Sequence, residues 1–62
     1  MNMQIEKEIE IWSKKSAHAI MSKENTGIYV IGVFGEKRFR TLEDATNFLE
    51  RNKYVFLAKF IY

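Results

Sequence analysis

The last third of the chain, residues 40–62, constrains the fold most, because a clear helix start is followed there by the most apolar segment of the sequence. The hydroxyl of Thr41 can accept a hydrogen bond from an amide of a first helical turn. Glu43 and Asp44 place negative charge at the positive end of the helix dipole. An apolar stripe follows at helical spacing, formed by Leu42, Ala45, Phe48 and Leu49. We therefore predict a helix that begins at Thr41 and runs for about three turns.

A long apolar segment follows this helix. Asn52 is suited to the left-handed conformation that closes many helices, so we expect the helix to end at about Arg51. Residues 54–62 are typical of a strand, being aromatic or aliphatic on both faces, with Lys59 as their single charge.

The middle of the chain predicts a hairpin. Residues 28–34 are short, β-branched and aromatic, and glycines bound them, which is typical of a strand. Gly27 suits a turn with a positive φ, and Gly35–Glu36 fits a two-residue hairpin loop that begins with glycine. Residues 37–40 then return as a short strand, whose charge suits the edge of a sheet.

The first 24 residues are compatible with two structures. As a strand, residues 1–11 alternate apolar with polar side chains, interrupted only at Lys7, and a helix over about 13–23 would follow. As one long helix, glutamates lie toward its start and lysines toward its end, which suits the dipole. Glutamate and lysine favour helices over strands, so we predict the single helix. Four apolar residues would share one face of it: Ile5, Ile9, Trp12 and Ile20.

The predicted fold is a single α+β domain over residues 1–62, in the order α-β-β-α-β. It has two helices and a three-stranded antiparallel sheet of strand order 2-1-3, with residues 28–34 as the central strand. The alternative is the split order β-α-β-β-α-β. The central and last strands are apolar on both faces, unlike most antiparallel sheets in small domains. Either the helices cover opposite faces of the sheet or one face is an interface.

The composition excludes several classes of protein. There is no cysteine, which removes disulfides and thiolate metal sites. The net charge of +2 is far below the basic balance of proteins that depend on phosphate contacts. No signal-peptide pattern or membrane-spanning apolar run occurs, so we expect a soluble cytoplasmic protein without a membrane partner. A domain this small is marginally stable alone, so we expect tight packing, a homo-oligomer or a protein partner.

No residue pattern predicts catalysis. His18 would have Lys14 and Ser22 as its helical neighbours, and neither is the carboxylate that a catalytic histidine uses. The serines near it match no nucleophile pattern, and the three glycines form no phosphate loop. We therefore predict no enzyme activity, no catalytic residues, no metal site and no cofactor.

Aromatic and basic residues supply two candidate binding sets. Arginine and aromatic residues are enriched at protein interfaces, which gives a predicted partner-binding set of Tyr29, Phe34, Lys37, Arg38, Arg40 and Tyr62. Cations interleaved with aromatic residues also suit nucleic acids, and the alternative nucleic-acid set is Lys37, Arg38, Arg40, Arg51 and Lys53. The structural alternative to both is a charged edge strand with its aromatic residues in the core.

The junction Arg38-Phe-Arg-Thr-Leu-Glu-Asp-Ala45 is similar to strand-to-helix junctions in two kinds of small module. One is the arm-type DNA-binding domain of phage integrases, and the other is the small phage-encoded inhibitors of host enzymes. The likeness covers about residues 28–50, and its pattern occurs in many folds. We predict a small non-enzymatic protein-binding module, a phage or mobile-element regulator or inhibitor that sterically blocks a larger host protein. The alternative is a small DNA-binding regulatory protein that uses the basic hairpin.

Overall fold

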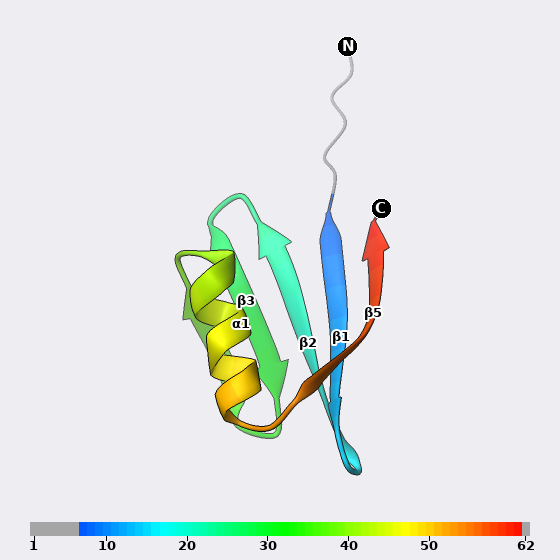
Figure 1. Cartoon of the computed structure of the whole chain (residues 1–62). Coiled ribbons are helices and arrows are strands. Elements are labelled where there is room, and N and C mark those ends of the chain that lie inside the picture. The colour runs from blue at the N-terminus through cyan, green and yellow to red at the C-terminus, as the bar shows by residue number, and fades with distance from the viewer. Residues whose placement is uncertain (1–6, 62) are drawn as a thin grey trace.

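The computed structural model describes residues 7–61, which form a single antiparallel sheet with a helix on one side (Figure 1). The strand order across the sheet is β4-β3-β2-β1-β5. The elements are β1 (Glu8–Lys14), β2 (Ala17–Glu24), β3 (Gly27–Gly32), β4 (Gly35–Phe39), α1 (Leu42–Arg51) and β5 (Val55–Ile61).

The predicted three-stranded sheet with two helices is wrong, because residues 7–61 form a five-stranded sheet with one helix. The hairpin of β1 and β2, which turns at Lys15 and Ser16, replaces the predicted N-terminal helix. The split βαβ alternative is also wrong, because residues 17–24 form a strand and not a helix. Its N-terminal strand agrees with β1 from Glu8 onward, and residues 1–6 lie outside the described residues.

Pairing between β1 and β2 explains why the helix prediction failed. Trp12 lies opposite Ala19, and both are buried together with Met21. Glutamate and lysine residues that favour a helix locally interact across strands here, since the ammonium of Lys23 donates a hydrogen bond to Glu8. Long-range burial of apolar side chains therefore outweighs local propensity in this segment.

The predicted hairpin before the helix is confirmed, but its turn comes two residues earlier, at Val33 and Phe34. The ring of Phe34 folds back over Gly32, where an added Cβ would lie 2.8 Å from a ring carbon. Only glycine therefore fits at this position without a shift of the ring. The predicted positive φ of Gly27 is confirmed at 146°.

The predicted C-terminal helix is confirmed. Thr41 caps α1, and its hydroxyl accepts a hydrogen bond from the amide of Asp44 at 3.1 Å. The expected left-handed conformation at Asn52 is wrong, since its φ is −91°, and Lys53 adopts the positive φ of 70° instead. This change of direction leads the chain away from the helix toward β5.

β5 does not return beside the strand that follows Gly27, as the predicted 2-1-3 order requires. It crosses the sheet and pairs with β1, at the edge far from β4 (Figure 1). The register shifts between Ile11 and Trp12, which face Ala58 and Phe56, so Leu57 has no direct partner on β1. This bulge ends the simple alternation that the sequence predicts for residues 54–62.

The core lies between α1 and the sheet. The helix contacts β3 and β4 on one side only, and β1 and β5 extend beyond it (Figure 1). The buried residues of the described chain are Trp12, Ala19, Met21, Val30, Ala45, Leu49 and Tyr54. No residue of β5 is buried, which leaves the last strand outside the core.

Candidate interaction surface

The side of the sheet opposite α1, here called the open face, has an apolar row that crosses four strands. Residues that lie directly opposite each other on paired strands point to the same face. Ile31 faces Ile20, Ile20 faces Ile11, and Ile11 faces Ala58. The buried residues under the helix belong to the other face, so no element of the described chain covers this row.

A second row lies two residues along the strands. Tyr29 faces Ser22, Ser22 faces Ile9, and Ile9 faces Phe60. The exposed fractions of Ile20, Ile31 and Phe60 are 43%, 48% and 48%. Contiguous exposed apolar residues mark interaction sites on small proteins. We define the apolar stripe as Ile9, Ile11, Ile20, Ile31, Ala58 and Phe60.

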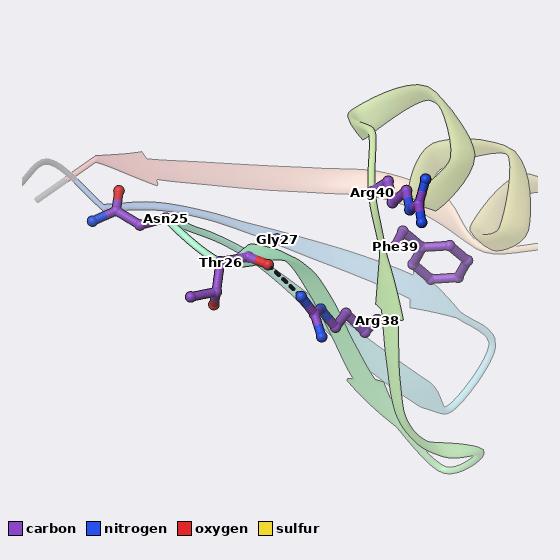
Figure 2. A pocket seen from close by; sticks show the side chains of 6 residues that line it. All are labelled: Asn25, Thr26, Gly27, Arg38, Phe39 and Arg40. Atoms are coloured by element: carbon purple, nitrogen blue, oxygen red, sulfur yellow. Dashed lines mark hydrogen bonds between the residues drawn. The ribbon is translucent and has the colours of Figure 1, made fainter.

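Arg38 lies at the β4 end of this second row, since it faces Tyr29 across β3 and β4. Its guanidinium donates a hydrogen bond of 2.8 Å to the carbonyl of Thr26, as Figure 2 shows, and lies 5.9 Å from the centre of the Tyr29 ring. The hydroxyls of Tyr29 and Thr26 are 2.9 Å apart. These contacts hold a cation and an aromatic ring together at one end of the open face.

Arg38 also lines a hollow between the β2–β3 turn and the end of β4. Figure 2 shows Arg38 pointing toward Thr26 and Arg40 lying farther along the chain, near the start of the helix. Guanidinium groups at a hollow suit a carboxylate or a phosphate. The lining residues are Asn25, Thr26, Gly27, Arg38, Phe39 and Arg40.

The predicted partner-binding set is divided by the structure. Tyr29 and Arg38 lie together on the open face. Phe34 is partly buried in the core, with its ring centre 5.1 Å from that of Phe48. Lys37 faces Val30 and therefore lies on the helix side of β4. Arg40 is exposed after β4, and Tyr62 lies outside the described residues.

The predicted nucleic-acid set does not form one surface. Lys37 and Arg38 are successive residues of β4 and point to opposite faces. Arg40 precedes the helix, whereas Arg51 and Lys53 follow at its other end, about 15 Å along the helix axis. The structure thus brings together no continuous basic track from these five residues.

Two carboxylates beside the sheet are held by neighbouring donors. The hydrogen bond from Lys23 to Glu8 lowers the pKa of the Glu8 carboxyl below its usual value, and Lys59, 3.8 Å away, acts in the same direction. The hydroxyl of Ser22 donates to Glu24 at 2.6 Å and lowers the pKa of that carboxyl. The Glu8 carboxylate on β1 thus pairs with a cation on each neighbouring strand, Lys23 on β2 and Lys59 on β5.

The apolar stripe was not predicted from the sequence. Alternation over residues 1–11 was visible as a strand signal, and it would have placed Ile9 and Ile11 on one face. Ile20 was placed on a helix face instead, so its alignment with Ile11 and Ile31 was missed. These residues become neighbours only through the register of the strands.

Residues 7–61 contain no cluster of three histidine, cysteine, aspartate or glutamate residues able to hold a metal ion. The helix of this part is too short and too polar to cross a membrane.

Comparisons with protein-family models, with curated proteins and with solved structures find no match to this chain. Its function is therefore inferred from the open face and its surroundings.

Proposed function

We propose that this chain is a small non-enzymatic protein-binding module whose open face docks on a larger protein. The observation that supports this function is the apolar stripe, which crosses β3, β2, β1 and β5 without a covering element among the described residues. A regulator or inhibitor encoded by a phage or another mobile element would act in this way. It would cover a surface that its host target needs for its own function.

Two regions of the open face contribute to binding in different ways. Burial of the apolar stripe supplies most of the favourable free energy, because that energy grows with the apolar area removed from water. Arg38, held by Tyr29 and Thr26, supplies a positive rim at one end. A charged rim chiefly affects the association rate and the choice of partner. The partner surface is therefore apolar, with acidic residues at one side.

Site-specific photocrosslinking tests the proposal. A photoreactive phenylalanine analogue replaces Ile31 on the open face, or Val33 in the adjacent turn as the matched control, whose exposed fraction is 82%. The full chain is then added to nuclease-treated bacterial lysate and irradiated. We expect position 31, and not position 33, to crosslink to a single host protein. The purified chain, added at one molecule per target molecule, should block the function of that host protein. The Ile20→Lys variant should lose both the crosslinking and the inhibition.

Three results would count against this function. They are equal crosslinking from positions 31 and 33, no crosslinking at all, and an Ile20→Lys variant that folds and still blocks the target. Capture that disappears with nuclease would favour the DNA-binding alternative instead. Binding should then weaken steeply between about 50 and 200 mM salt, and Arg38→Ala should weaken it on all sequences alike.

A further inference from the structure

The outer edge of β5 has unused pairing capacity. Within residues 7–61, β5 pairs with β1 alone, so backbone N–H and C=O groups of this seven-residue strand point away from the sheet along its other side. Sheet edges in monomers are usually short, charged or covered. β5 is long, carries one charge, Lys59, and has a bulge at Leu57, and no other described residue covers its outer edge. Its large apolar side chains are all exposed: Val55, Phe56, Leu57, Phe60 and Ile61.

We infer that β5 pairs antiparallel with β5 of a second copy of this chain, which joins the two sheets into one. A two-fold axis through Ala58 relates the two β5 strands. This assignment concerns the outer edge of β5 and its helix side, where Leu57 lies next to Phe56, the residue opposite Trp12. It shares the β5 residues Ala58 and Phe60 with the apolar stripe and otherwise lies outside the open face.

The single charge of β5 favours an axis through Ala58 over one through Lys59. Residues that share a face must lie opposite each other, so the two-fold axis passes through a residue and not between two residues. An axis through Lys59 would place two lysines directly opposite, which is unfavourable. An axis through Ala58 places Leu57 opposite Lys59 of the second copy. Each Lys59 remains beside its own Glu8, 3.8 Å away, so no charge is left without a counter-charge.

The apolar surface at this edge is large enough for a dimer. About half of each large apolar side chain of β5 is exposed, which is roughly 100 Å² for a side chain of about 200 Å². Five such residues in each of two copies offer on the order of 1,000 Å², the lower limit for a specific interface. On the helix side, Leu57 of each copy would lie beside Lys59 of the other copy and next to its own Phe56.

The small core gives a reason for the second copy. The buried residues of the described chain number seven, and β5 contributes none of them. Domains of this length usually gain stability from disulfides, metals or association, and this chain has no cysteine. Pairing at β5 would bury apolar side chains at the edge that α1 leaves uncovered.

Sedimentation equilibrium of the full chain and three variants tests the inference. We expect a wild-type dimer with a dissociation constant in the micromolar range. Leu57→Lys should weaken it at least about tenfold, because it places a lysine opposite Lys59 of the second copy. Leu57→Glu should weaken it less, because the new carboxylate lies opposite an ammonium group. Val33→Lys, on the distant β3–β4 turn, should leave the constant unchanged.

Hydrogen exchange of the wild type gives an independent measurement that needs no variant. Amides of β5 should become more protected as the protein concentration rises through the dissociation constant, and amides of β4 should not. A wild-type monomer at about 1 mM would overturn the inference. So would a dimer that Leu57→Lys and Val33→Lys affect equally, or β5 protection that is independent of concentration. Ile20→Lys should leave the dimer intact, which separates this result from failure of open-face docking.

Discussion

β4 and β5 form the two edges of the same sheet, but only β4 lies against the helix. β4 is five residues long and has the charged run Glu36, Lys37 and Arg38 at its centre. β5 is seven residues long, has Lys59 as its single charge, and lies beyond the helix (Figure 1). Charge and cover discourage further pairing at an edge, so the chain protects one edge of its sheet and leaves the other available.

The difference follows from the path of the chain around α1. The helix follows β4 directly and packs back on β3 and β4, so its buried residues Ala45 and Leu49 complete the core in that half. Within residues 7–61 no second helix covers β1 and β5. Within residues 7–61, the large apolar side chains of β5 remain exposed and are available to another molecule. The two halves therefore separate residues that stabilise the fold from residues that we propose serve association.

The sharpest test of this separation uses two leucines. Leu49 in α1 is fully buried, whereas the exposed fraction of Leu57 in β5 is 57%. We expect Leu49→Ala to lower the free energy of unfolding by about 2–5 kcal/mol, because it leaves a cavity in the core. Leu57→Ala should change it by less than about 0.5 kcal/mol in the dilute monomer. Urea unfolding followed by the fluorescence of Trp12 measures both.

Protein concentration is the control for this leucine pair. At concentrations where the wild type is dimeric, Leu57→Ala should cost more than it does in the dilute monomer, because association adds to apparent stability. Equal losses for Leu49→Ala and Leu57→Ala in the monomer would show that β5 belongs to the core, and the comparison would fail.

A second prediction concerns the close packing in the covered half. Gly32→Ala places a Cβ 2.8 Å from the ring of Phe34, which itself packs against Phe48 and Tyr54. The ring must move, and we expect a loss of about 1–3 kcal/mol in the free energy of unfolding. Chemical denaturation measures this loss.

The source of this loss can be separated from a general effect of alanine in a strand. Phe34→Leu in the Gly32→Ala background should recover part of the loss, so the two substitutions should be coupled in a double-mutant cycle. Strictly additive losses would mean that the Phe34 ring does not set the requirement for glycine.

Local signals were sufficient to predict part of this fold. The cap at Thr41, the spacing of Ala45 and Leu49, and the glycines around β3 act over a few residues, and the helix and hairpin they predict are present. The N-terminal hairpin was not predicted, because its glutamates and lysines favour a helix locally. Its strand form depends on burying Trp12 and Met21 beneath distant elements.

The open face was harder to predict from the sequence than the helix and the hairpin before it. The last strand is apolar on both faces, which predicts either covering helices or an interface. We predicted that it lies beside the strand after Gly27. In the structure it is an edge strand beside β1, and its register aligns Ala58 and Phe60 with Ile11 and Ile9. Register across four strands is set by tertiary pairing and not by spacing in one segment.

The smallest expected change in stability concerns the boundary between β1 and β5, here called the seam. Glu8 of β1 forms ion pairs there with Lys59 of β5 and, on its other side, with Lys23 of β2. The pKa of the Glu8 carboxyl is lowered from 4.5 in the folded chain, mainly by the hydrogen bond from Lys23. Its stabilising contribution is therefore present above about pH 4.5 and is lost as the pH falls through the lowered pKa. Glu8→Gln should reduce the urea midpoint at pH 7, and its effect should shrink as the pH falls through the lowered pKa.

The sign of this pH dependence distinguishes a structural ion pair from a general charge effect. Glu36→Gln on β4 removes one carboxylate that has no ion pair among the described residues, so it controls for net charge. A difference between wild type and Glu8→Gln that shrinks on acidification and in high salt supports a seam held partly by charge. If the difference stays the same as the pH falls, the ion pairs of Glu8 do not hold β1 and β5 together, and backbone pairing and the contact between Trp12 and Phe56 remain to do so.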